Sequence, residues 1–477
     1  MVALRPLTLR RNDMKEKQFK IVSPGSGEVF AERSYASDSD IREALTKAGR
    51  IAPDWKSTPL QDRISICEKA VKFFVENADA WGEEITRMMG RPIRYTPNEI
   101  KGSFQERARH MIDIAPEALV DVGLAQKEGF YRFIRREPLG TVLVLAPWNY
   151  PYLTSVNVII PALLAGNRVI LKHSEQTAIC AERYLQAFQA AGLPEGVFQF
   201  LHLTHDQVAG LIHDPKIDYV AFTGSVDGGR AIQKAASDRF INAGLELGGK
   251  DPAYVCRDAD WDYTIANVVD GVFFNSGQSC CAIERIYVEA SVFDDFLNDF
   301  ITLTKKYQLG DPLDANTTLG PMVRKSNALQ AKSQLEKAIS EGAQTNIPAG
   351  TFPELGLPYL APQVLTNVSQ TMDVMQEESF APFIGIMPVK DDAEAIRLMN
   401  DSQYGLTASI WTLDMERAIS IGSQVETGTW FMNRCDYLDP ELAWTGVKNS
   451  GRGCTLSILG YEHITRPKSY HLKFDTR

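Results

Sequence analysis

Short apolar runs alternate with helix-like segments through the middle of the chain. The runs lie at 141–146, 168–172, 197–201 and 218–225. Turn-forming residues flank them, as is typical of buried strands. Between the runs, apolar residues recur at helical spacing, as in residues 176–192, which end in glycine. Strands that alternate with helices predict a parallel sheet with helices on both faces, joined by right-handed crossovers.

A second alternating block extends from residue 245 to about residue 445. Its expected strands lie at 284–290, 382–389 and 407–412, and its expected helices at 293–307 and 391–402. The sequence therefore predicts an α/β fold with two lobes of comparable size and a cleft between them.

Two further segments fit neither lobe. Residues 129–138 and 469–474 alternate bulky and charged side chains, as half-exposed strands do. An isolated strand leaves the backbone groups along its edges unpaired. We therefore expect these segments to pair with each other and with another subunit.

The composition is that of an ordinary globular protein. Hydrophobic residues make up 44% and charged residues 23% of the 477 positions, a length that suggests two or three domains. The formal net charge of -10 disfavours binding to nucleic acid. No apolar run approaches the roughly 20 residues that cross a bilayer, so we expect no membrane span. Residues 1–16 are interpreted as a loose tail in preference to a transit peptide.

Seven cysteines are spread thinly along the chain, in odd number and without a C-x-x-C pair. This usage is typical of a reducing compartment, so we expect a cytoplasmic protein. His202, His205 and His213 have no acidic or thiolate residue at a spacing that would complete a metal site. We interpret them as surface histidines and expect no bound metal.

Four residues are candidates for chemistry. Cys280 and Cys281 end the stretch FFNSGQSCC, where a disulfide between neighbours would be strained, so packing and a nucleophilic role both stay open. Glu246 in LELGGK is either a surface carboxylate at a strand end or a general base whose pKa is raised by partial burial. Asn149 in APWNYP is either a turn residue or a donor to a developing oxyanion.

Polar residues and glycines also follow three of the expected strands. Parallel sheets bind ligands beyond the carboxyl ends of their strands, so these residues are expected to converge on one nucleotide site. They are Trp148 and Asn149, Lys172 and Glu175, and Gly224 and Ser225.

Five motifs together resemble the aldehyde dehydrogenase superfamily of NAD(P)-dependent enzymes. PWNYP, FTGS, LELGGK, FFNSGQSC and EESFAP occur in the family's order and at close to its spacing, from about residue 20 to the C-terminus. Each motif is weak alone, whereas the ordered set is specific. The resemblance implies the α/β fold of that family, with two Rossmann-like lobes and a small oligomerisation flap of β-strands.

The resemblance implies a role for each matching residue. Cys280 is then the nucleophile, Glu246 the general base and Asn149 the oxyanion donor, and an aldehyde is oxidised to a carboxylic acid through a thiohemiacetal and a thioester. The implied NAD-binding residues are Trp148, Lys172, Glu175, Gly224, Ser225, Gly229, Glu378 and Phe380. No G-x-G-x-x-G pattern follows a strand, and GSVDGG at 224–229 serves instead, because its glycines let the backbone approach phosphate.

The resemblance also implies how the chain is divided and assembled. The implied parts are an NAD-binding domain at 17–120 and 139–246, a catalytic domain at 247–446, and oligomerisation segments at 121–138 and 447–477. A homodimer or a dimer of dimers is expected. NAD is expected in preference to NADP, because the carboxylate of Glu175 would repel a 2′-phosphate, although Lys172 and Ser174 could tolerate one.

The sequence leaves the aldehyde open. The implied substrate pocket is lined by Tyr150, Thr154, Asn157, Ser279, Cys281, Arg434 and Trp444. Its aromatic residues favour an apolar or aromatic aldehyde, whereas Arg434 could bind the carboxylate of a semialdehyde. An ion pair of Arg434 with Asp436 or Asp439 is the alternative.

The chain also departs from the family pattern. It reads LAWTGVKNSGRG at 442–453, and it has Ser379 and Ala381 in EESFAP. The pocket shape and the subunit contacts near Trp444 therefore do not follow from the resemblance. A CoA-acylating relative typically lacks the glutamate that matches Glu246, and a non-catalytic relative would be expected to lose that residue or Cys280. Both residues are present, which favours a dehydrogenase that releases a free acid.

Overall fold

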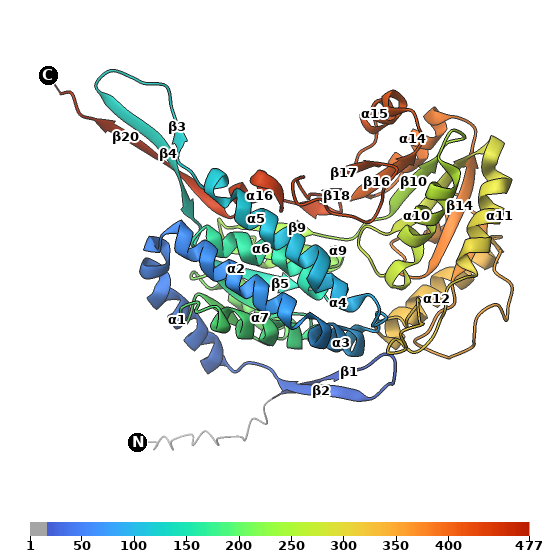
Figure 1. Ribbon diagram of the computed structural model, residues 1–477, viewed down its shortest axis with the longest axis horizontal. Coiled ribbons are helices and arrows are strands. Elements are labelled where there is room, and N and C mark those ends of the chain that lie inside the picture. Colours follow the sequence, from blue (N-terminus) through green and yellow to red (C-terminus); the bar gives the residue numbers. More distant parts are fainter. Residues whose placement is uncertain (1–16, 477) are drawn as a thin grey trace, which may run out of the picture.

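The computed structural model describes residues 17–476, in which two α/β lobes lie side by side and an arm of β-strands projects from one of them (Figure 1). The α/β fold expected from the alternating pattern is confirmed. The loose tail expected at residues 1–16 lies outside the described residues.

The first lobe contains a six-stranded sheet in the order β19-β9-β8-β5-β6-β7. Its strands are β5 (Thr141–Ala146), β6 (Arg168–His173), β7 (Phe198–Phe200), β8 (Tyr219–Thr223), β9 (Asn242–Glu246) and β19 (Gly451–Arg452). All pair in parallel except β19, which is antiparallel to β9. Every residue of β5 is buried, because helices cover both faces of this central strand, and this explains its continuous apolar run.

Helices and a small hairpin surround this sheet. The hairpin is β1 (Gln18–Val22) with β2 (Val29–Ser34), and the helices are α1 (Asp38–Ser57), α2 (Leu60–Glu76), α3 (Ala78–Met89), α4 (Thr96–Asn98), α5 (Gln105–Ala118), α6 (Pro151–Leu164), α7 (Ile179–Ala190), α8 (His205–His213) and α9 (Val226–Ala235). Phe74 of α2 packs against Tyr152 of α6 and Tyr184 of α7, so these helices share one core. A π-helical turn at Glu99–Phe104 leads into α5.

The second lobe contains a seven-stranded sheet in the order β12-β13-β14-β11-β10-β16-β17. Its strands are β10 (Asp251–Val255), β11 (Ile283–Glu289), β12 (Gln344–Thr345), β13 (Gln363–Thr366), β14 (Phe383–Val389), β16 (Thr407–Trp411) and β17 (Thr429–Met432). Only β12 is antiparallel to its neighbour. The helices of this lobe are α10 (Trp261–Phe273), α11 (Phe293–Thr304), α12 (Lys325–Ser340), α13 (Asp373–Gln376), α14 (Asp392–Asn400) and α15 (Met415–Gly422).

The chain crosses from the first sheet to the second at residues 247–250. Glu246 is the last residue of β9, and Asp251 is the first residue of β10. A Cβ atom on Gly248 would meet the carboxylate of Glu378 at 2.1 Å, so glycine is needed there for the two segments to approach. The crossing therefore puts Glu246 at the border of the two lobes.

The arm consists of β3 (Val122–Gly123), β4 (Phe130–Pro138) and β20 (Thr465–Lys473) (Figure 1). β20 pairs antiparallel with β4 from Thr465 opposite Pro138 to Lys473 opposite Phe130. The rings of Phe133 and Tyr470 stack across the pair at 4.4 Å. The expected pairing of segments 129–138 and 469–474 with each other is therefore confirmed.

Residues 447–477, which were expected to serve association, have a more varied arrangement. β18 (Val447–Lys448) pairs with β15 (Tyr404–Gly405), and β19 joins the first sheet beside Glu246. α16 (Ser457–His463) then leads into β20, which alone of these elements belongs to the arm. In the described part of the chain, no helix has the length and apolar character needed to span a bilayer.

Candidate active site

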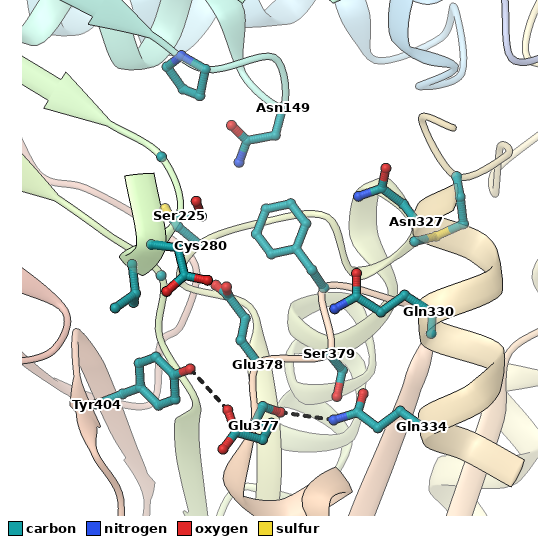
Figure 2. Close-up of a pocket in the computed structure, with 18 of the residues that line it drawn as sticks. Asn149, Ser225, Cys280, Asn327, Gln330, Gln334, Glu377, Glu378, Ser379 and Tyr404 are labelled. Carbon is teal, nitrogen blue, oxygen red and sulfur yellow. Dashed lines mark hydrogen bonds between the residues drawn. The ribbon is translucent and has the colours of Figure 1, made fainter. Parts of the chain in front are cut away.

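Two cavities meet at Cys280. The larger has a volume of about 890 Å³ and opens between the lobes (Figure 2). The smaller has a volume of about 230 Å³. Both are lined by Thr223, Glu246 and Cys280, so the thiol and the carboxylate stand where a molecule in one cavity would meet a molecule in the other.

The turn that carries Cys280 is held in an unusual backbone conformation. Asn275, Ser276 and Gly277 have φ values of 53°, 57° and 71°, in the left-handed region. A Cβ atom on Gly277 would lie 2.4 Å from the carbonyl oxygen of Ala381, which explains the glycine. Left-handed residues of this kind are costly and persist where the surroundings enforce them, often at functional sites.

Hydrogen bonds fix this turn to a neighbouring loop. The Gln278 side chain accepts from the backbone N–H of Val323 at 2.8 Å and donates to the carbonyl of Asn275 at 3.0 Å. The Ser276 hydroxyl donates to the carbonyl of Gly320 at 2.7 Å. These contacts explain the buried polar residues before Cys280, and they hold the turn that carries it in place.

The two adjacent thiols have different surroundings. Cys280 is partly exposed and faces both cavities, whereas Cys281 is buried and faces only the smaller one. The Cys281 thiol donates to Oδ1 of Asp436 at 3.1 Å, and the adjacent Cys280 together with burial raises the pKa of Cys281 well above its usual value. At neutral pH, Cys281 is thus a protonated thiol that lines the smaller cavity.

Two hydrogen-bond donors near Cys280 are without an acceptor. Among the described residues, neither the Asn149 side chain nor the backbone N–H of Cys280 forms a hydrogen bond, although Asn149 is buried. Figure 2 shows Asn149 and Cys280 directed into the larger cavity from different segments. Unpaired donors aimed at a common space fit the stabilisation of a developing negative charge.

Glu246 is bound through both carboxylate oxygens. Oε1 accepts from the hydroxyl of Thr455 at 2.5 Å, and Oε2 accepts from the hydroxyl of Thr223 at 3.0 Å. Burial raises the pKa of Glu246, and the two hydroxyls partly offset that rise. A carboxylate of raised pKa beside a thiol fits the role of a general base.

The N-terminus of α9 faces the larger cavity. Ser225 caps this helix by accepting from the backbone N–H of Gly228 at 3.2 Å, and Gly224, Ser225, Val226 and Asp227 line the cavity. A Cβ atom on Gly224 would lie 2.6 Å from the ring of Phe222. A helix N-terminus that faces a cavity suits a phosphate group, so the cavity fits a dinucleotide.

The other end of this cavity is formed by the EESFAP segment. Oε1 of Glu378 accepts from the backbone N–H of Gly249 at 3.2 Å, and the ring of Phe380 packs edge-on against Trp148. Glu284 accepts from the backbone N–H groups of Ser379 and Phe380, both at 2.8 Å, and fixes the segment. All three expected residues, Trp148, Glu378 and Phe380, line the cavity.

Three expected cofactor residues do not line this cavity. Lys172 and Glu175 lie at the end of β6, and the Glu175 carboxylate accepts from the hydroxyl of Tyr35 at 2.6 Å. Gly229 is buried in the first turn of α9, where a Cβ atom would lie 2.7 Å from the Leu247 side chain. Gly229 therefore allows helix and strand to pack closely, and its contact is with protein.

The smaller cavity contains six of the seven residues expected in the substrate pocket. They are Tyr150, Thr154, Asn157, Ser279, Cys281 and Trp444. Arg434 differs, because it is exposed, lies outside the lining and packs over the ring of Tyr437 at 3.6 Å. The alternative ion pair with Asp436 or Asp439 is also absent among the described residues. Asn433 and Asp436 have positive φ values, and this twisted loop turns Asp436 inward.

Sequence reasoning missed three charged residues of this cavity, Arg107, Asp270 and Asp436. Arg107, on the first turn of α5, is only 4% exposed, and its Nη1 donates to the Leu153 carbonyl at 2.9 Å and to Oδ1 of Asn157 at 3.3 Å. Asp436 accepts from the Ser279 hydroxyl at 2.6 Å, and burial raises its pKa to about 6. One signal was available, since Arg107 occupies an otherwise apolar stripe with Phe104, Ala108 and Met111.

The larger cavity also contains residues that were not expected to bind the cofactor. Arg230, Asn327, Gln330, Gln334, Lys337, Glu377, Gln403 and Tyr404 line it. In Figure 2, Tyr404 and Gln334 both form hydrogen bonds with Glu377. These residues come from α9, α12, β15 and loops of the second lobe, far apart in sequence.

The three histidines that were considered as metal ligands, His202, His205 and His213, are not equivalent. His205 and His213 are exposed, as expected. His202 is largely enclosed: its side chain is 10% exposed, packs against Phe19 and Phe200, and lies 3.5 Å from the Glu182 carboxylate. Across residues 17–476, no group of three or more His, Cys, Asp or Glu side chains is arranged to hold a metal ion.

Comparison with known proteins adds to this geometry. The model of the aldehyde dehydrogenase family matches residues 11–470. The chain is 33% identical over 445 residues to the NAD(P)+ succinate semialdehyde dehydrogenase Sad of Escherichia coli (strain K12), covering 92% of this chain and 94% of that protein. It is 31% identical to a probable betaine aldehyde dehydrogenase of Schizosaccharomyces pombe (strain 972 / ATCC 24843), covering 95% and 91%. The structure of an NAD-dependent aldehyde dehydrogenase from Sinorhizobium meliloti superimposes with a TM-score of 0.92 at 29% identity, covering 97% and 92%.

Proposed function

The chain belongs to the aldehyde dehydrogenase family, whose members oxidise aldehydes with NAD or NADP, and from this premise we propose that it uses NAD and forms a thioester on Cys280. The observation that carries the proposal is the meeting of the two cavities at Cys280 and Glu246. A cofactor in the larger cavity and an aldehyde in the smaller one would both reach this thiol.

The chain's own residues account for the covalent steps. The Cys280 thiolate attacks the aldehyde carbon, and the oxyanion receives hydrogen bonds from the Asn149 amide and the backbone N–H of Cys280. NAD, when bound, supplies the acceptor for the hydride that leaves as the carbonyl re-forms. Glu246 then removes a proton from the water that attacks the thioester, and the carboxylic acid is released.

The larger cavity supports the binding of a dinucleotide. The N-terminus of α9, with Gly224 and Ser225, would hold the pyrophosphate, and Glu378, Phe380 and Trp148 would hold the nicotinamide half. Lys172 and Glu175 would hold the adenosine ribose. The preference for NAD rests on Glu175, since its carboxylate accepts hydrogen bonds from ribose hydroxyls and repels a 2′-phosphate.

The central test is an activity assay with purified protein, NAD and a panel of aldehydes, in which the absorbance of reduced cofactor is followed. We expect NAD reduction with release of the free acid. Addition of CoA should leave the product unchanged, whereas acyl-CoA formation would favour the CoA-acylating alternative. Absence of reduction with every aldehyde would favour the non-catalytic alternative.

A second candidate is a semialdehyde dehydrogenase in which Arg107 takes the place first considered for Arg434. Arg107 remains charged when buried, and no described carboxylate forms an ion pair with it. Its Nε also lacks an acceptor in the described structure. A substrate carboxylate in the smaller cavity would supply the missing negative partner.

The two candidates differ in the substrate they prefer. If Arg107 binds a carboxylate, Arg107→Met should raise KM about tenfold to a hundredfold for an aldehyde with a distal carboxylate. KM for an unsubstituted aldehyde of equal length should change much less. Arg434→Gln is the matched control, because that arginine is exposed outside the cavity. Equal kcat/KM of the unaltered enzyme for both aldehydes would exclude the semialdehyde candidate.

Assembly, division and location follow the same premise. We propose that residues 17–120 and 139–246 bind NAD, that 247–446 carry out catalysis, and that 121–138 with β20 join subunits into a homodimer or a dimer of dimers. The free edge of β20 and exposed Phe474 support an association surface. Seven free cysteines support a reducing, cytoplasmic location.

A further inference from the structure

We propose that Thr455 and Thr223 are positioning residues that orient the Glu246 carboxylate for thioester hydrolysis and keep it charged. The inference rests on the proposed role of Glu246 as general base. It goes beyond that role by assigning a function to Thr455, which lies two residues after the segment 442–453 in which this chain departs from the family pattern.

The contacts engage the carboxylate from two sides. Thr455 donates to Oε1 at 2.5 Å and Thr223 donates to Oε2 at 3.0 Å. A carboxylate whose two oxygens are bonded to separate donors has little freedom to rotate about its last torsion. Each oxygen keeps a further lone pair, so Glu246 can still accept a proton from water.

The backbone of each threonine is itself held in place. Thr455 exchanges two backbone hydrogen bonds with Trp444, at 2.8 and 3.0 Å, in an antiparallel bridge. Its backbone also packs against Gly460, where a Cβ atom would lie 3.1 Å from the Thr455 carbonyl carbon. Thr223 is the last residue of β8 and lies directly opposite Glu246 in the parallel pair of β8 with β9.

This arrangement links the base to the aldehyde cavity. Trp444 is 4% exposed and lines the smaller cavity, and the residue bridged to it holds Glu246. Trp444, which lines the aldehyde cavity, and Thr455, which binds the base, therefore belong to the same antiparallel bridge. A neighbouring threonine, Thr445, bonds to the Gly453 carbonyl at 2.7 Å and makes no contact with Glu246.

The charges around Glu246 make the hydroxyls important. Burial disfavours the charged form of Glu246 and raises its pKa. The hydrogen bonds from Thr455 and Thr223 lower the pKa, and each does so more strongly than the positive charge of Arg107. Tyr219 and Cys454 also interact with the charge of Glu246, and Cys280 lines both cavities together with it. Removal of one donor should therefore raise the pKa of Glu246 and leave less of it ionised at neutral pH.

The experiment measures hydrolysis of the acyl-enzyme directly. The enzyme is acylated with p-nitrophenyl acetate, acid-quenched at intervals across pH 5 to 9, and the lifetime of the acetyl adduct is read from intact mass. In the plot of hydrolysis rate against pH, the acidic limb is the range in which the rate rises as Glu246 ionises. We expect Thr455→Val to shift this limb upward by about one pH unit, so that rates within it are about tenfold lower. Thr223→Val should act in the same direction, and Thr455→Ser should restore the original limb.

Controls separate this inference from the proposed function. Thr445→Val should leave the limb unchanged, because its hydroxyl serves only the same segment. If Glu246→Gln hydrolyses the adduct normally, the proposed base is wrong and the proposed function fails at that step. If Glu246→Gln is slow but Thr455→Val keeps the original limb, or if Thr455→Ser behaves like Thr455→Val, the positioning role is overturned.

Discussion

The hydroxyl of Tyr35 donates a hydrogen bond to Oε1 of Glu175 at 2.6 Å, across 140 residues of sequence. Tyr35 follows β2 of the N-terminal hairpin, whereas Glu175 follows β6 of the first sheet. The phenol remains protonated, since burial and the Glu175 carboxylate raise the pKa of Tyr35 to about 12. The hairpin thus orients the carboxylate that we assign to the adenosine ribose.

Loss of this hydrogen bond should weaken the choice between cofactors. Tyr35→Phe frees Glu175 to rotate toward solvent, so we expect the KM for NAD to rise about fivefold, as for one lost hydrogen bond to a charged group. Glu175→Ser should raise the use of NADP as well, because the repulsion of the 2′-phosphate is gone. Steady-state kinetics with both cofactors measure the two ratios.

Tyr263→Phe is the matched control, because its hydroxyl bonds to the Asn433 carbonyl in the other lobe. It should change neither ratio. Equal catalytic efficiency of the unaltered enzyme with NAD and NADP would contradict the role of Glu175.

The two adjacent thiols should respond differently to replacement. Cys280→Ala should lower kcat by on the order of 10⁴-fold, because no thioester can form, while NAD binding persists. Cys281→Ser should still acylate and turn over, with its main effect on substrate KM, because Cys281 lines only the smaller cavity. Activity assays and NAD titrations on the same preparations measure both effects. An active Cys280→Ala together with an inactive Cys281→Ala would identify the other thiol as the nucleophile.

The affinity for NAD should rise with pH. Burial, and then the charge of Glu284, raise the pKa of Glu378 to about 8, so this carboxyl is largely protonated at pH 7 and ionised at pH 9. The ionised form accepts hydrogen bonds from both ribose hydroxyls, and the protonated form accepts them more weakly. We expect the Kd for NAD to fall about fivefold between pH 6.5 and 9, as measured by titration calorimetry.

Glu378→Gln tests the assignment of this pH dependence. The amide does not titrate, so its Kd should stay constant over the same range. A steep pH dependence that survives in Glu378→Gln would show that another group is responsible.

The strands and the reacting residues could be predicted because local pattern determines them. β5, β6 and β11 are apolar runs of buried sheet, and they appear within a residue or two of their expected bounds. Cys280, Glu246 and Asn149 stand at strand ends or tight turns, which parallel topology brings to one edge. Their convergence on one cavity therefore follows from the order of motifs.

The residues that depend on long-range contacts could not be predicted. Arg107 reaches the smaller cavity only because α5 packs on α6, and Tyr35 reaches Glu175 only because the hairpin folds over the first sheet. Arg434 lies outside the smaller cavity and Asp436 lines it, because Asn433 and Asp436 have positive φ values in a loop without periodicity. The sequence of such a loop has no hydrophobic periodicity that would predict which side chain points inward.

Association should depend on β20. Removal of residues 469–477 takes away the outer part of the strand, including Tyr470, which stacks on Phe133, and Phe474, which is 72% exposed. β4 would then lose its partner along half its length, and the apolar surface offered to another subunit would shrink. We expect the shortened chain to dissociate at concentrations where the full chain stays assembled, as measured by light scattering.

A chain that lacks only 475–477 keeps β20 whole and should assemble normally. NAD binding should survive in both, because the cofactor cavity contains no residue of the arm. A full-length chain that is monomeric at micromolar concentration would contradict the assignment of the arm to association.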